Sequence, residues 1–173
     1  PIFMDNLILS PSERDNYYLS MDYRTFNHQK IINDPYLNKA FINAKDLIER
    51  FRIGKLTTSQ IFDIKKLAKW AAISDVMGAW HGFGFSNMRF YFNPLISKFE
   101  PIPDDNFNEY SLNYVHNSRL YRYNDFYNNG RFLKQLFSDY NFSKIYFQEL
   151  ERVTNIDYLN DIFFKFTNEL KYI

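Results

Sequence analysis

Side chains suited to holding a divalent cation gather near the middle of this chain of 173 residues. Asn87 precedes one short segment of alternating residue types, and Asp104 and Asp105 directly follow a second. Carboxamide and carboxylate oxygens are ligands that Mg²⁺ prefers in proteins. In phosphoryl transfer a protein mainly positions groups and neutralises charge, so a site of this kind suits that reaction.

A hairpin would bring these side chains together. Alternation of apolar and polar residues predicts short strands over 88–92 and 98–102, joined by a turn that contains an Asn-Pro step. If the last residue of the first strand faces Lys98, antiparallel pairing places Asn87 opposite Pro103. The two aspartates would then lie at the same open end.

His81 is a third candidate, brought to the same end by a glycine-rich segment. An unperturbed imidazole titrates near pH 6.5, so His81 could act as a general base. Alternatively, it caps the preceding helix, where its charge suits the helix dipole. Asn87 and Asp105 likewise have a plain alternative as hairpin-end residues that bond nearby backbone.

Two helices are expected to position this hairpin. The first begins at Asp34-Pro35, a capping carboxylate followed by proline, and ends at Gly54. The second begins near Asp63. Its later part, 70–80, is apolar nearly all round, which is typical of a buried helix.

The last third of the sequence carries three apolar stripes at helical spacing. Their residues are Phe132, Leu133, Leu136 and Phe137; Ile145, Tyr146, Leu150 and Val153; and Leu159, Ile162, Phe163, Phe166 and Leu170. The expected fold is α+β and mostly α: one domain over 1–173, with helices around a buried central helix and one β-hairpin.

Composition narrows the functional classes. An aromatic content of 20% indicates a folded chain, and the absence of cysteine excludes disulfides and zinc–thiolate sites. A formal net charge of +1 without a basic stripe argues against nucleic acid as a partner. No stretch reaches the length of about 20 apolar residues that a transmembrane helix needs.

The central block resembles that of the CotH kinase family, atypical protein-kinase-like proteins first associated with bacterial spore coats. The resemblance rests on 86–94 (SNMRFYFNP) and 99–105 (FEPIPDD), which follow the buried helix and its Trp-His-Gly step. The helices expected over 132–137 and 146–152 are also similar to the family. The resemblance covers roughly 60–170.

Carried over residue by residue, the resemblance gives Asn87 as the metal-binding Asn and Asp105 as the metal-binding Asp. Asp104, the alternate metal ligand, falls where the family usually has an aromatic residue. His81 stands where the catalytic Asp is expected, six residues before Asn87 rather than five, and counting back five gives Gly82. The catalytic Asp therefore does not carry over.

The resemblance implies a kinase-like C-terminal lobe that uses Mg²⁺ and ATP to phosphorylate Ser or Thr of a protein substrate. The 33 residues that precede the first expected helix, 1–33, are too few for the family's nucleotide-binding N-terminal lobe. The isolated chain is therefore expected to be a poor enzyme, whatever a longer parent does. By analogy with the family, an extracytoplasmic or cell-surface location is expected.

Two alternatives belong to other classes. A non-catalytic, pseudokinase-like interaction module would explain the missing Asp and the missing lobe. The aromatic, Asn-rich loop 107–127 could instead bind carbohydrate by ring stacking, although such a loop is also typical of a segment pinned to the core by its rings.

Overall fold

The structure, a computed structural model, describes residues 18–79, 82, 87–104, 130–167 and 171. In these residues the elements follow in the order α2 (His28–Asn33), α3 (Pro35–Arg52), α4 (Thr58–Ile61), α5 (Ile64–Met77), β1 (Arg89–Asn93), β2 (Lys98–Ile102), α6 (Gly130–Phe137), α7 (Tyr140–Thr154) and α8 (Ile156–Lys165). The described part is mostly helical with one antiparallel hairpin, which confirms the predicted fold class.

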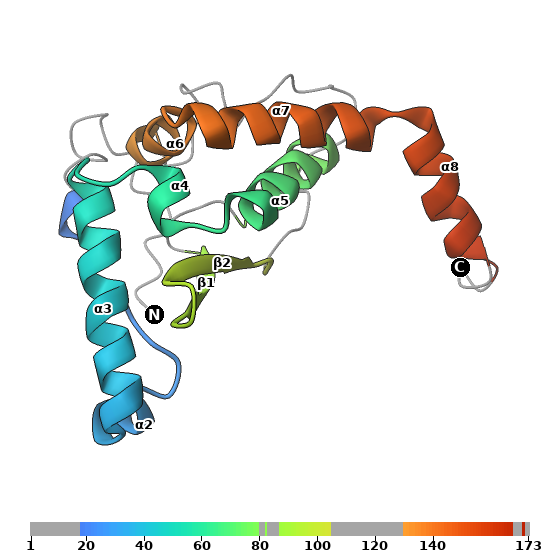
Figure 1. The fold of residues 1–173 in the computed structure, drawn as a ribbon. Coiled ribbons are helices and arrows are strands. Elements are labelled where there is room, and N and C mark those ends of the chain that lie inside the picture. Colours follow the sequence, from blue (N-terminus) through green and yellow to red (C-terminus); the bar gives the residue numbers. More distant parts are fainter. Residues whose placement is uncertain (1–17, 80–81, 83–86, 105–129, 168–170, 172–173) are drawn as a thin grey trace, which may run out of the picture.

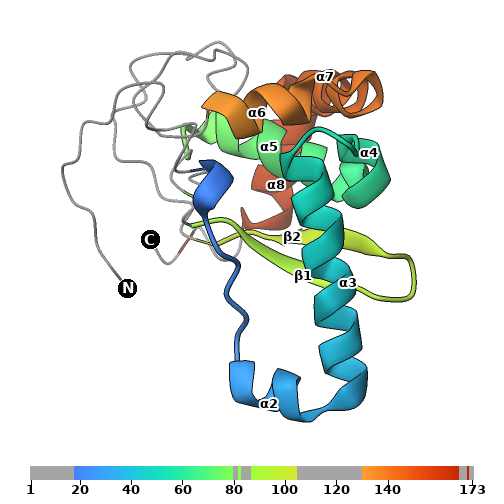
Figure 2. The ribbon, with the colours of Figure 1, turned by 90° about the vertical axis from the view of Figure 1, so that its left-hand side faces the viewer.

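The helices form a core with two projecting arms (Figure 1). Helix α7 lies over α5, and the hairpin lies on the other side of α5. Helix α3 runs away from this core to α2, and α8 turns away from the far end of α7. In the second view α6 and α7 again lie over α5, while α3 descends from α4 to α2 (Figure 2).

Helix α3 begins and ends as the sequence predicts. The Asp34 side chain accepts hydrogen bonds from the amides of Tyr36 and Leu37, and Pro35 occupies the first turn. After the last turn Gly54 adopts a left-handed conformation with φ of 75°, which glycine tolerates best.

Helix α5 is the buried central helix. Asp63 caps it by accepting from the amide of Lys66, and Gly78 ends it in a left-handed conformation. Its buried residues are Leu67, Ala68, Trp70, Ala71, Ala72, Ser74 and Asp75. The predicted burial fails only in the last turn, where Val76 and Met77 are exposed.

The hairpin register differs from the prediction by one residue. Asn93, not Phe92, lies opposite Lys98. The turn is shorter than expected because Asn93 ends β1 and its side-chain oxygen accepts from the amide of Leu95 at 3.1 Å. Ser97, with a left-handed φ of 51°, closes the turn before β2. The whole second strand therefore shifts by one position along the first.

An aromatic cluster attaches the hairpin to the core. Phe99 of β2 packs against Phe90, Phe92 and Phe62, with ring centroids 5.2–6.1 Å apart. The amide of Asp63 also donates to the carbonyl of Phe99 at 2.9 Å. The face of the hairpin that carries these rings is thus fixed against the start of α5.

The C-terminal helices bury two of the three predicted stripes. Those of α6 and α7 are buried or half-buried, with Leu136 and Tyr146 wholly enclosed. In the third stripe Leu159, Ile162 and Phe163 lie in α8, which buries no residue. Phe166 is the residue that follows this helix and is exposed, and Leu170 lies outside the described residues. Among the described residues, no helix has the combined length and hydropathy of a membrane span.

Candidate functional site

The strand pairing of the hairpin ends just before Asn87 and Asp104. The last pair within the strands is Arg89 opposite Ile102. Continued by two residues, this register places Asn87 opposite Asp104, where the prediction had Pro103. Side chains alternate along a strand, so Arg89 belongs to the face opposite to the aromatic cluster. A continued register would give Asn87 and Asp104 the same face as Arg89.

Arg89 contacts two other residues at this end. Its guanidinium donates to the Asp104 carboxylate and lies over the ring of Phe26, 5.6 Å from the ring centroid. Arg89 and Asp104 remain 42% and 47% exposed in their side chains. The carboxylate that was the alternate metal ligand is therefore already paired with a cation from the protein.

The remaining candidates are only partly covered by the structure. Asn87 is half-buried. His81, Asp105 and the loop 107–127 lie outside the described residues. Within the part of the chain that the structure describes, no three acidic, His or Cys side chains are grouped as a metal site.

A second polar group lies farther along the same face of the hairpin. Glu100 accepts from the Lys66 ammonium of α5 and from the Asn93 amide group. The hydrogen bond from Lys66 lowers the pKa of the Glu100 carboxyl, with a further contribution from Asn93. The same bond raises the pKa of Lys66. This network ties the polar face of the hairpin to α5 with its charges paired.

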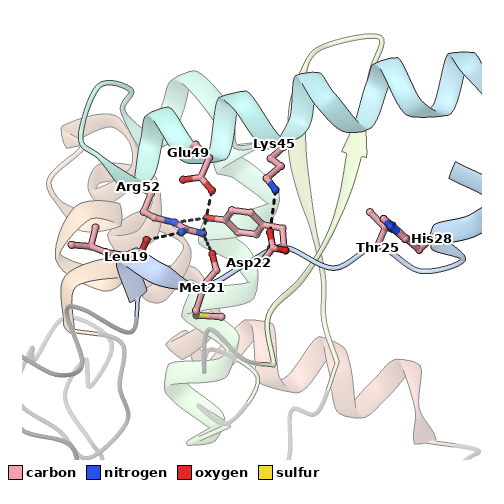
Figure 3. Close-up of polar contacts among 9 residues, drawn as sticks. Leu19, Met21, Asp22, Thr25, His28, Lys45, Glu49 and Arg52 are labelled. Atoms are coloured by element: carbon pink, nitrogen blue, oxygen red, sulfur yellow. Dashed lines mark hydrogen bonds and ion pairs between the residues drawn. The ribbon is translucent and has the colours of Figure 1, made fainter. Parts of the chain in front are cut away.

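Arg52, at the end of α3, is one of two charged residues that are only 4% exposed in the described structure; the other is Asp75 (Figure 3 shows Arg52). Its Nε donates to Tyr23 Oη at 2.8 Å, and its two terminal nitrogens donate to the carbonyls of Leu19 and Met21 at 2.9 and 2.6 Å. Glu49 lies 3.5 Å from one of these nitrogens. Arg52 thus binds a backbone segment of its own chain.

Tyrosine rings and an ion pair complete this attachment. The Arg52 guanidinium lies 4.5 Å from the ring centroid of Tyr23 and 5.9 Å from that of Tyr18. Burial raises the pKa of both tyrosines, so their hydroxyls stay neutral. About two helical turns before Arg52 in α3, Lys45 pairs with Asp22 at 3.1 Å (Figure 3).

This arrangement could not be predicted from residue types alone. Arginine is among the residue types that are least often buried, so its type gives no sign that Arg52 is enclosed. Because its donors are used by Tyr23, Leu19 and Met21, the cluster is an anchor for the N-terminal segment rather than a ligand site.

A buried pair joins the two central helices. The hydroxyl of Tyr146 in α7 donates to the carboxylate of Asp75 in α5, and both residues are buried. Burial raises the pKa of Tyr146, and the charge of Asp75 raises it further. Tyr146 therefore remains a hydrogen-bond donor and is not suited to act as a base.

Comparison with known proteins gives no match to this chain among protein-family models, curated proteins or solved structures.

Proposed function

We propose that this chain is the C-terminal lobe of a CotH-like kinase, which in its intact parent transfers the terminal phosphoryl group of Mg²⁺–ATP to a protein Ser or Thr. The observation that carries the proposal is the pairing of β1 with β2, whose register, continued by two residues, would bring Asn87 level with Asp104. Asp105 is the next residue in the sequence. The resemblance to the family gives Asn87 and Asp105 the metal-binding roles.

The contact between Arg89 and Asp104 favours one aspartate over the other. Asp104 already has a cationic partner, so Asp105 is the better candidate to share a metal with Asn87. A carboxamide oxygen and a carboxylate suit Mg²⁺, which keeps several waters and binds the phosphates of the nucleotide directly. When bound, the metal would neutralise charge on those phosphates.

Calorimetric titration of Mg²⁺–ATP into this chain, and into any longer parent protein, tests the proposal. We expect Asn87→Ala and Asp105→Asn each to weaken binding at least about tenfold, since each removes a direct ligand of the metal. Asn160→Ala and Asp157→Asn are matched controls on the exposed α8 and should bind as the wild type does. Absence of binding by both proteins, or unchanged binding by the first two variants, would reject the proposal.

A non-catalytic interaction module is the second candidate, and α8 is the observation that favours it. Ile156, Phe163 and Phe164 are 60–82% exposed on α8, a helix that buries no residue and packs against α7. Exposed apolar residues gathered in this way often mark a protein interface. On this hypothesis Phe163→Ser abolishes partner binding, whereas Asn87→Ala and Asp105→Asn do not change it.

A further inference from the structure

The two long edges of the hairpin differ. On the β2 edge the carbonyl of Phe99 accepts from the amide of Asp63 at 2.9 Å, and Phe62 forms a parallel bridge with Phe99. Farther along this edge Pro101 has no N–H to donate. Strand β1 is the outer strand, since β2 lies between it and α5 in both views (Figures 1 and 2). An added strand would therefore have to pair with β1.

The backbone of β1 offers hydrogen-bonding groups on its outer side. Phe92 lies opposite Phe99, and Phe90 lies opposite Pro101. Because the Phe99 carbonyl points away from β1, the backbone groups of these two pairs face outward, and those of Phe90 and Phe92 point away from β2. In the part of the chain that the structure describes, no hydrogen bond joins these outward groups to another segment.

Strand β1 also lacks the devices that usually protect an exposed edge. Proline, lysine, a bulge or a covering segment normally prevents pairing with another chain. Strand β1 contains neither proline nor lysine, and its pairing with β2 runs without a bulge. Its central residues, Phe90, Tyr91 and Phe92, are of types that favour strands. Tyr91 is 53% exposed, and the two phenylalanines are only half-buried.

We propose that β1 pairs antiparallel with β1 of a second copy of this chain, about a two-fold axis at Tyr91. In this register Phe90 of each copy bonds Phe92 of the other, which uses the outward N–H and carbonyl of both residues. Tyr91 then lies against Tyr91 of the second copy. Arg89 lies opposite Asn93, whose amide group already donates to Glu100, so no two like charges are directly opposed.

The aromatic cluster and the covered β2 edge favour a second copy as the occupant. Phe90 and Phe92 of the two copies would lie side by side on the apolar face and join the ring clusters around each Phe99. Since the β2 edge is covered, each hairpin has one edge to offer, and association closes at two copies instead of continuing into a fibre. This inference does not depend on the proposed function.

The dimer should be weak. Two paired five-residue strands bury less than the area of about 1,600 Å² that is typical of stable interfaces. We therefore expect a dimer at about 100 µM protein and a monomer at about 1 µM. Sedimentation equilibrium over this range measures the association. Amide hydrogen exchange of Phe90 and Phe92 should slow at the higher concentration, whereas that of Tyr91, whose amide faces β2, should not change.

Charged substitutions at Tyr91 test the position of the axis. Tyr91→Lys and Tyr91→Glu each place two like charges face to face and should weaken the dimer at least about tenfold. An equimolar mixture of the two variants should restore association, because Lys then faces Glu. Tyr140→Lys is the control, since Tyr140 is 76% exposed on α7, on the other side of α5 from the hairpin. It should associate as the wild type does.

A wild type that stays monomeric at the higher concentration would overturn the inference. It would do so even if a synthetic peptide of residues 88–94 binds, because the edge would then take an extended peptide and not a second copy. A dimer that persists in both variants at Tyr91, or that their mixture does not restore, would also overturn it. Thermal unfolding at low concentration checks that each variant retains its fold.

Discussion

Asp139 and Ser59 join the starts of two helices that lie far apart in the sequence. One carboxylate oxygen of Asp139 accepts from the Ser59 amide at 2.7 Å and from its hydroxyl at 2.6 Å. The other oxygen accepts from the amides of Asn141 and Phe142, in the first turn of α7. Asp139 thus caps α7 and the N-terminal turn of α4 together, while only 7% exposed.

Replacement of this carboxylate is expected to lower the free energy of unfolding by more than the loss of an ordinary helix cap does. Asp139→Ala should lower the free energy of unfolding by about 2–4 kcal/mol, because it leaves buried donors in both α4 and α7 without their acceptor. Asn155→Ala is the matched control, since Asn155 is exposed and its side chain caps only α8, and it should cost about 1 kcal/mol. Urea unfolding measures both, and equal losses would contradict the double role.

The same contacts predict that the stability of the fold depends on pH in the acid range. Burial alone would raise the pKa of Asp139, but the hydrogen bonds from Ser59 and Phe142 lower it below its ordinary value of 3.8. A carboxyl with a lowered pKa in the folded state stabilises the fold at pH above its unfolded value, and this contribution disappears as the pH falls through the folded value. Stability should therefore fall below about pH 4, and Asp139→Asn should flatten that fall. An equally steep acid transition in the variant would exclude Asp139 as its source.

Arg52 should decide whether the N-terminal segment stays attached to α3. Arg52→Met keeps much of the apolar stem but leaves the carbonyls of Leu19 and Met21 without their donor, so we expect a loss of about 2–4 kcal/mol. Hydrogen exchange should also become faster in 19–23. Arg50→Met is the control, because the Arg50 side chain is 48% exposed and pairs only loosely with Asp46, at 3.4 Å. Faster exchange in the control than in Arg52→Met would refute the anchoring role.

Local chemistry explains why the helix starts could be predicted from the sequence. Asp34-Pro35 and Asp63 mark the starts of α3 and α5 by capping contacts that involve only the next few residues. The short helix α2 escaped prediction because Asn27 caps it without a side-chain bond. The burial of Arg52 could not be predicted from the sequence, because it depends on Tyr23 and on backbone groups about 30 residues away.

Apolar periodicity predicts a helix but not what covers it. The stripe of Leu159, Phe163 and Phe166 correctly indicates helix in α8, yet these side chains are exposed, whereas the similar stripe of α7 is buried against α5. The hairpin register shows the same limit, because the length of its turn depends on local contacts such as the hydrogen bond from the Leu95 amide to the Asn93 side chain. Asn93 rather than Phe92 therefore lies opposite Lys98.

The buried pair of Tyr146 and Asp75 should contribute to the packing of α7 on α5. Tyr146→Phe removes the hydroxyl and so deprives a buried carboxylate of a donor, with an expected cost of about 1–3 kcal/mol. Tyr140→Phe is a suitable control, because Tyr140 is 76% exposed and lies in the same helix. Thermal unfolding of the two variants measures the difference, and a variant Tyr146→Phe as stable as Tyr140→Phe would show that the bond does not stabilise the fold.

Phe99 should be the residue on which attachment of the hairpin depends most. Its ring is buried and contacts those of Phe62, Phe90 and Phe92, so Phe99→Ala should lower the free energy of unfolding by about 3–5 kcal/mol. Tyr91→Ala removes a ring of similar size from the exposed face of the same hairpin and should cost less than about 1 kcal/mol. If Phe99→Leu restores most of the stability, volume rather than ring geometry holds the hairpin. Comparable losses in Phe99→Ala and Tyr91→Ala, measured by urea unfolding, would mean that the aromatic cluster does not fix the hairpin to α5.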